Sequence, residues 1–271
     1  MKNDYFIYKA FYDTTLPGNI ECGMHSSKCL FKNTAFTLAE TLITLGIIGV
    51  VAAMTIPNLI TEHQKRRTVT ELQRAISILN QAYKLSYEEN GAPSSTEILD
   101  DGTEYVFEKY WAPYVKVLAY CSTYDVCGYT SKLPFTQTNG STASYQLTTD
   151  ANITFWTLDG FLYSSQVAGY GCSSGTCTCV TKNSKKICVD KNRTMVADLN
   201  GSKAPNRYGK DVFLLSTVES SFVEGNISVI PRCYDYTDDE IDEDCSSTGK
   251  GYCCAEKIRR AGWKIEKDYP W

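Results

Sequence analysis

An uninterrupted apolar segment near the N-terminus is the feature that most constrains how this chain folds. Residues 36–59 read FTLAETLITLGIIGVVAAMTIPNL, and Glu40 is the one ionisable side chain among them. With a helical rise of ~1.5 Å per residue, about 20 apolar residues span the ~30 Å hydrocarbon layer of a bilayer. The segment therefore predicts a transmembrane helix. A carboxylate within it needs a partner or a place at the headgroup boundary.

A cleaved secretory signal is the main alternative for this segment. Such a signal has a shorter apolar run that is followed by a small-residue cleavage site and then by mature sequence. Here Ala52 and Ala53 are followed directly by Met54, Thr55, Ile56 and Pro57, with no change in character. We therefore expect the segment to be retained in the mature chain.

The residues at the start of the segment point to a specific family. Ala35-Phe36-Thr37-Leu38-Ala39-Glu40 resembles the processing site of type IV prepilins and type II secretion pseudopilins, and Gly49 and Pro57 also fall at family positions. The resemblance implies that residues 1–35 are a leader, which a prepilin peptidase/methyltransferase removes between Ala35 and Phe36. It further implies that Phe36 is methylated, and that Glu40 governs assembly with other pilin or pseudopilin subunits.

Two features of the leader depart from the family pattern. The family usually has Gly before the cut, where this chain has Ala35, and a leader of 35 residues is long. Met24 offers a second start, which would give a short leader containing Lys28 and Lys32. On this interpretation residues 1–23 are an extension that is not translated.

The chemistry of Glu40 and Pro57 can be argued directly. Cleavage before Phe36 would free an α-amine in a low-dielectric setting, where an ammonium needs a counter-charge. Glu40, one helical turn further on, can supply that charge to its own chain or to a neighbouring subunit. The resemblance implies that Glu40 pairs with the N-terminal amine of a neighbouring subunit. Pro57 removes one helical hydrogen bond and is expected to kink or loosen the helix.

Ten of the twelve cysteines follow the apolar segment. An even set on one side of a membrane segment indicates disulfides in an oxidising compartment. Zinc is the alternative, but the chain has no C-x-x-C pair and only two histidines. Short separations in the sequence suggest disulfides that close local loops. These are Cys121–Cys127 and either Cys172–Cys177 or Cys179–Cys188. The other candidates are Cys233, Cys245, Cys253 and Cys254.

The two sides of the segment give conflicting signals about its orientation. Lys65, Arg66 and Arg67 follow it and would favour a cytoplasmic C-terminus by the positive-inside rule. Lys28, Lys32 and the cysteines favour the opposite orientation. We therefore expect a single-pass protein whose C-terminal head lies outside the cytoplasm. The resemblance implies that the membrane is the bacterial inner membrane, and that the periplasmic or extracellular head lies in a filament after assembly.

The rest of the chain predicts an α+β fold, and the resemblance implies that it is pilin-like, with a long N-terminal helix packed on a disulfide-rich antiparallel β head. Residues 36–59 form the transmembrane and assembly helix, residues 60–90 its amphipathic continuation, and residues 91–271 the globular head. Spacings of three and four predict the buried face of the continuation. Its members are Val69, Leu72, Ile76, Leu79, Tyr83 and Tyr87.

Several segments of the head suggest helices or strands. Residues 104–118 predict a second helix, and residues 153–164 predict a hairpin that turns at Asp159-Gly160. Residues 186–197 predict a strand pair. Further strands are expected at 212–215 and 227–230, and a short helix at 255–261. The aromatic C-terminus is expected to pack on the body.

The loop from Asp198 to Asp211 is the most site-like part of the head. Asp198, Asn200 and Asp211 could gather around Ca²⁺, since carboxylate and amide oxygens suit that ion. The loop lacks the full spacing of a calcium motif. The alternative is an Asx-turn loop whose side chains satisfy its own backbone. The acidic run 238–244 is interpreted as a solvated loop, with a second cation site as the alternative.

These observations lead to a functional hypothesis without catalysis. A Ser-His-Asp or Cys-His centre is disfavoured because His63 is the one histidine of the predicted mature chain. The net charge of −4 gives no global basic field for nucleic acid, which stays open only as a ligand of the head. We expect a structural pilus or pseudopilus subunit. The alternative is a minor pilin or tip adhesin whose head binds a surface, DNA or a secreted substrate.

Overall fold

A computed structural model describes residues 37–91, 102–147, 152–166, 177–182, 185–190, 193–219 and 227–271. Helix α1 spans Leu38–Asn90, with Pro57 inside it. The chain divides into two compact units, Met1–Leu59 and Ile60–Trp271. The predicted cleavage site between Ala35 and Phe36 and the predicted methylation of Phe36 lie outside the described residues.

The first part of α1 is apolar and exposed. This stretch is long and apolar enough to cross a membrane, by length and composition. Its large side chains lie open to the surroundings; Leu38 is 79% and Leu59 72% exposed. Such a run of exposed apolar side chains is favourable in a lipid environment or against another protein, and unfavourable in water.

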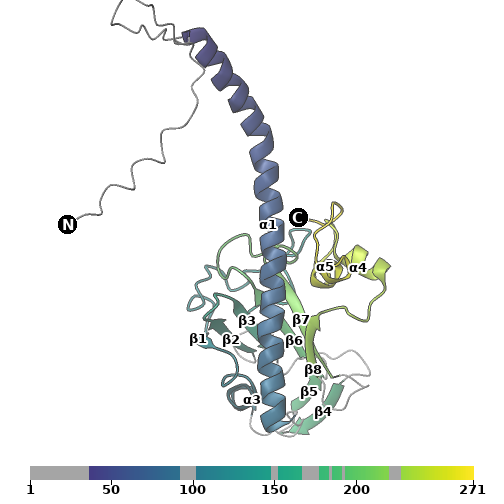
Figure 1. Cartoon of the computed structure of the whole chain (residues 1–271). Helices are drawn as coiled ribbons and strands as arrows, with labels where there is room; N and C mark the ends of the chain where they lie inside the picture. The colour runs from purple at the N-terminus through teal and green to yellow at the C-terminus, as the bar shows by residue number, and fades with distance from the viewer. Residues whose placement is uncertain are drawn as a thin grey trace, which may run out of the picture. The chain divides into compact units, whose positions relative to one another are not determined.

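The second unit contains the remainder of α1, whose buried face follows the helical period. Its buried side chains are Val69, Leu72, Ala75, Ile76, Leu79, Ala82, Tyr83 and Ser86. Residues three and four apart lie on one side of a helix, so these side chains form a single stripe. Figure 1 shows that this part of α1 lies across one face of a β-sheet.

The sheet has six antiparallel strands in the order β1-β2-β3-β6-β7-β8. Their bounds are Val117–Cys121, Asn152–Thr157, Leu162–Gln166, Arg193–Asp198, Val212–Glu219 and Ile227–Pro231. Strands β4 (Cys177–Lys182) and β5 (Lys185–Asp190) form a separate two-stranded sheet. Helices α3 (Gly102–Tyr110), α4 (Asp238–Asp244) and α5 (Cys254–Arg260) complete the described elements. The architecture is α+β.

Alternation along the strands gives the six-stranded sheet two buried faces. Tyr163 of β3 and Phe213 of β7 belong to the core that contains α1. Their neighbours Leu162 and Leu214 belong to a second core, built with the segment 121–147. Because successive side chains of a strand point to opposite faces, a sheet covered on both sides needs apolar residues at adjacent positions.

The edge strand β8 is covered by a side chain of α1. The Val229 N–H donates to Asn80 Oδ1 at 2.7 Å, and Asn80 Nδ2 donates to the Val229 carbonyl at 2.8 Å. The amide of Asn80 thus takes the place of a further strand. An edge whose backbone groups are paired in this way is protected from pairing with another chain.

Replacing Asn80 by Ala is expected to lower the free energy of unfolding by about 1–3 kcal/mol, since it leaves the buried Val229 backbone without partners. Thermal unfolding of the full chain in detergent would measure the loss. Gln81→Ala is the matched control, because within the described part of the chain the exposed Gln81 side chain bonds only to Ser77 on the same helix. Equal melting temperatures for the two variants would contradict the role given to Asn80.

The structure corrects two expectations about the head and confirms others. The helix predicted over 104–118 ends at Tyr110, and 117–121 is strand β1; Pro113 disfavours helical backbone at the residue before it. The two strands expected within 186–197 are present as β5 and β6, but their pairing with each other is wrong, since β5 pairs with β4 whereas β6 lies between β3 and β7. The hairpin of β2 and β3, strands β7 and β8, and helix α5 are confirmed.

Candidate functional site

Glu40 lies in the first turn of α1 and forms a capping box with Thr37. The Thr37 N–H donates to Glu40 Oε2 at 2.8 Å, and the Glu40 N–H donates to Thr37 Oγ1 at 3.2 Å. This reciprocal pair satisfies two backbone donors at a helix start. Glu40 therefore has a local structural role in this chain, and its predicted assembly role has to be separated from that role by experiment. Pro57 lies further along α1, which continues on both sides of it.

The residues proposed for calcium lie together at the ends of β6 and β7. Asp198 is fully buried, and its Oδ2 accepts a 2.6 Å hydrogen bond from the Tyr129 hydroxyl. Its Oδ1 accepts from the Asn200 N–H at 3.1 Å, which is an Asx-turn contact. The sequence analysis did not predict Tyr129 as part of this site. Tyr129 lies 69 positions before Asp198, and no local sequence pattern indicates that their side chains are hydrogen-bonded.

Asp211 is the second buried carboxyl of this loop. Its oxygens accept from the backbone N–H groups of Asn206 at 2.9 Å and Arg207 at 2.7 Å. Asn200 Nδ2 also donates to Asp211, at 3.1 Å. The two aspartates and Asn200 are thus brought together as the sequence predicted. Most of their oxygens serve the loop's own backbone, as in the Asx-turn interpretation.

One oxygen of this cluster has no hydrogen-bond partner among the described residues. This atom is Asn200 Oδ1, which is buried. Burial raises the pKa of Asp198 well above its usual range, and the nearby Asp211 adds to this. Burial also raises the pKa of Asp211. A cation would offset the cost of ionising both carboxyls and would engage the free Asn200 oxygen. Calcium at this loop stays a prediction.

Titration of the full chain in detergent with Ca²⁺ tests that prediction. Binding is expected to release heat and to raise the melting temperature of the wild-type chain at neutral pH, because a ligand that binds only the folded state stabilises it. Asp211→Asn is expected to abolish both signals. A wild-type chain that shows neither heat nor a higher melting temperature has no calcium site at this loop.

The raised pKa of Asp198 also predicts how stability depends on pH without metal. The folded state binds this proton more tightly than the unfolded chain, so its stabilising effect is complete below about pH 4 and is lost as pH rises through the raised pKa. The loss is about 1.4 kcal/mol for every unit by which the folded pKa exceeds the unfolded one. Urea unfolding from pH 4 to 8 should show a shallower decline for Asp198→Asn than for the wild type. Parallel curves would contradict this prediction.

A groove of about 680 Å³ lies beside this loop. Asn200 and Asp211 line it together with Lys203, Lys210 and residues of α1. Its charges are largely matched: Arg67 pairs with Glu71 at 2.8 Å, Arg74 pairs with Asp159, and the Lys210 ammonium lies over the Trp271 ring. With its cations so engaged, the groove gives no independent indication of a ligand.

The cysteine prediction is confirmed in part. Cys121–Cys127 forms the local disulfide that the sequence suggested, and Cys233–Cys253 and Cys245–Cys254 form two more. The backbone register of β4 and β5 places Cys179 opposite Cys188. The side chains of Cys177, Cys179 and Cys188 lie outside the described part of the chain, as does Cys172 altogether.

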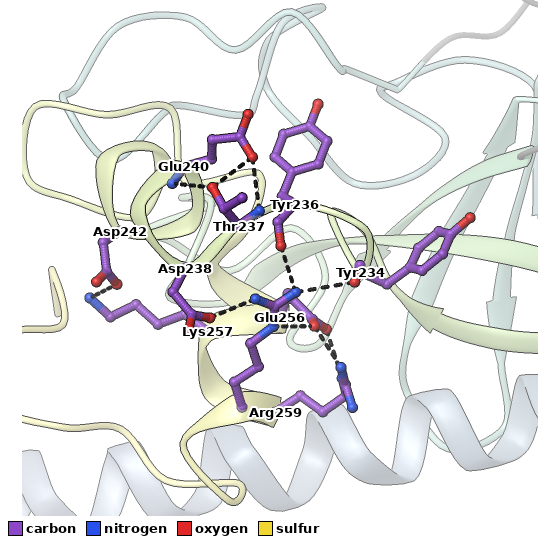
Figure 2. Close-up of polar contacts among 10 residues, drawn as sticks. Tyr234, Tyr236, Thr237, Asp238, Glu240, Asp242, Glu256, Lys257 and Arg259 are labelled. Atoms are coloured by element: carbon purple, nitrogen blue, oxygen red, sulfur yellow. Dashed lines mark hydrogen bonds and ion pairs between the residues drawn. The ribbon is translucent and has the colours of Figure 1, made fainter. Parts of the chain in front are cut away.

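The acidic run 238–244 is solvated as expected, since five of its six acidic side chains are exposed, but it forms helix α4 rather than a loop. Thr237 and Glu240 form a capping box at its start, and acids in the first turn of a helix interact favourably with its dipole. Asp238 pairs with Arg260 at 2.6 Å, and Asp242 pairs with Lys257 at 3.0 Å (Figure 2). Within the described residues no group of three His, Cys, Asp or Glu side chains could hold a metal ion, which leaves the second cation site without support.

Helix α5 carries a buried carboxylate that joins this network. Glu256 is fully buried and accepts from Arg259 Nε at 2.7 Å and from Arg260 Nε at 2.8 Å. Arg260 also donates to the carbonyls of Tyr234 and Tyr236 (Figure 2). A buried charge is tolerated when it is paired and hydrogen-bonded in this way. Two disulfides and these ion pairs hold α4, α5 and the preceding loop as one unit, the cysteine clamp (residues 233–260).

Comparison with known proteins places the second unit in a family. Residues 58–271 match the family described as "Family of unknown function (DUF6613)". No curated protein matches the chain, and no solved structure matches it. The matched region begins within α1, after most of the apolar segment, and includes the whole sheet and the cysteine clamp. The chain therefore belongs to DUF6613, a family of unknown function.

Proposed function

We propose that this protein is a structural subunit of a type IV pilus or a type II secretion pseudopilus. In this proposal a prepilin peptidase/methyltransferase cuts the chain between Ala35 and Phe36 and methylates Phe36. The subunit then stands in the inner membrane with its head outside the cytoplasm, and polymerises through α1. Its role is structural, and the proposal assigns it no catalysis.

The observation that carries the proposal is one carboxylate in an otherwise apolar, exposed helical segment. In residues 38–59 Glu40 alone is ionisable, and it lies in the first turn of α1. A plain membrane anchor has no need of a carboxylate there, and a helix start can be capped by uncharged residues. A carboxylate placed one turn after a newly formed amine supplies the charge that such an amine requires.

The proposed processing has a direct test. Mass spectrometry of the chain isolated from membranes should find a mature N-terminus at methylated Phe36. Electron microscopy and peptide analysis of sheared surface filaments should then find the mature chain in them. A mature chain that begins at any other residue would overturn the assignment to this family of subunits.

The size of the head keeps a binding role as a second candidate. The second unit extends over residues 60–271 and adds a separate β4–β5 sheet and a cysteine clamp to the six-stranded sheet. This head is larger than many major subunits need, so a minor pilin or tip adhesin also fits. Copy number in sheared filaments separates the two: an abundant chain is structural, and a chain present in trace amounts is a minor or tip component.

A further inference from the structure

A groove of about 600 Å³ lies between α1 and the C-terminal segment of the second unit. One wall is formed by Lys65, Arg66 and Val69 of α1, and the other by Trp263, Lys264 and Ile265. We call it the α1–Trp263 groove. Its residues are separated by almost 200 positions in the sequence and meet only in the folded chain.

The charge of the groove is predominantly positive. Three cations line it, and Glu62 is the one carboxylate among the lining residues. Glu62 is already paired with Lys65 at 3.1 Å. Arg66 and Lys264 are exposed and form no ion pair within the described part of the chain. Two cations without carboxylate partners therefore border one cavity.

Each wall of the groove also contributes apolar side chains that are held by the core. Val69 is buried, and Trp263 and Ile265 pack against the core that contains α1. Trp263 has a left-handed backbone with φ of 60°, and its N–H donates to the Ile258 carbonyl at 2.9 Å. A bulky residue adopts this conformation only where the surrounding structure holds it, and such positions are concentrated at binding sites.

The position of the groove along α1 relates it to the membrane. Arg66 follows Leu59, the last residue of the apolar segment, by seven residues, which is about 10 Å of helical rise. A headgroup layer is about 5–7 Å thick on each side of the hydrocarbon. Long basic side chains extend back toward that layer, and Trp favours it.

We propose that the α1–Trp263 groove binds the headgroup of an anionic phospholipid of the bilayer that holds the apolar segment. Arg66 and Lys264 pair with the phosphate, while Trp263 and Ile265 form the apolar sides of the groove beside the headgroup. This contact would fix the height and rotation of the head above the membrane before assembly. The inference rests on the membrane insertion that the proposed function requires.

The test uses the full chain in nanodiscs of phosphatidylcholine containing a minor fraction of phosphatidylglycerol. After gentle extraction, native mass spectrometry counts the phosphatidylglycerol molecules retained on each protein. Wild type is expected to retain one in preference to phosphatidylcholine. Arg66→Gln combined with Lys264→Gln should weaken retention by roughly 10- to 30-fold, given the effect of each basic residue near an anionic surface.

The matched control is Lys116→Gln combined with Lys132→Gln, which removes the same charge from exposed positions outside the groove. It should retain the lipid as the wild type does, and all three chains should melt at the same temperature. Equal retention by the groove variant and the wild type would overturn the inference. So would equal losses in both variants, or a groove variant that keeps its lipid and fails only to bind other copies of the chain.

Membrane extraction and filament content distinguish a failure of the proposed function from a failure of the groove assignment. A chain that alkaline carbonate extracts from membranes is not inserted, which would overturn both the function and the groove assignment. An inserted chain with no preference for phosphatidylglycerol would overturn the groove assignment alone. An inserted chain that keeps the lipid but is absent from filaments would leave the groove assignment standing and refute the filament subunit.

Discussion

Glu40→Ala is expected to leave cleavage before Phe36 largely intact and to abolish incorporation of the chain into filaments. The physical reason is the charge of the carboxylate. Without it, the new N-terminal amine of the neighbouring subunit would be placed in a low-dielectric setting with no counter-charge, which is strongly unfavourable. The measurement is the amount of the chain in sheared filaments, relative to the mature chain in the membrane fraction. We expect a loss of at least about tenfold, which corresponds to about 1.4 kcal/mol.

The capping box of Thr37 and Glu40 requires two further variants. Thr37→Ala removes the side-chain contacts of the cap but keeps the carboxylate. Glu40→Gln keeps an oxygen that can accept from the Thr37 N–H but removes the charge. If charge drives assembly, Thr37→Ala assembles and Glu40→Gln does not. If Glu40 only caps the helix, the order is reversed, and unaltered filaments in both Glu40 variants would refute its assembly role.

Opening the cysteine clamp is expected to have the largest effect on the stability of the head. Its disulfides close chain separations of 20 residues (Cys233–Cys253) and 9 residues (Cys245–Cys254). Each such crosslink typically contributes about 2–4 kcal/mol. Replacing all four cysteines by Ser should therefore lower the free energy of unfolding by at least about 4 kcal/mol, a large part of the stability of an ordinary domain.

Urea unfolding of the exported full chain in detergent would measure this loss, and limited proteolysis would locate it. New cleavage sites are expected first within the clamp, because Glu256 and its arginine partners lose the support that holds α5. Cys121→Ser combined with Cys127→Ser is the matched control, since that disulfide closes a separation of only 6 residues. This control should lower the free energy of unfolding by less than the clamp variant does. A clamp variant as stable as this control would show that ion pairs alone hold α4 and α5.

Short-range patterns let the sequence predict a substantial part of the fold. The three- and four-residue spacing from Val69 to Tyr83 marks the face of α1 that the structure buries. The apolar runs on either side of Asp159-Gly160 predict the hairpin of β2 and β3, which turns at Gly160 with φ of 85°. Cys121 and Cys127 are near neighbours in the chain, so their pairing was also accessible.

Other elements depend on contacts that no local pattern encodes. The segment 117–121 becomes a strand because β2 offers an edge that it can join, and Pro113 separates it from α3. Strand β6 pairs with β3 and β7, although β5 precedes it directly in the sequence. The acidic run 238–244 forms a helix because Thr237 caps its first turn and cations of α5 pair with two of its carboxylates.

The candidate sites divide in the same way. The sequence by itself determined the apolar segment with its single carboxylate, the period of α1 and the gathering of Asp198, Asn200 and Asp211, since each depends on residues close together in the chain. Only the tertiary structure decided that Tyr129 donates to Asp198, that Asn80 covers β8, and that Trp263 and Lys264 line one groove with Arg66. These contacts join residues far apart in the chain, and packing of the whole domain determines which of them form.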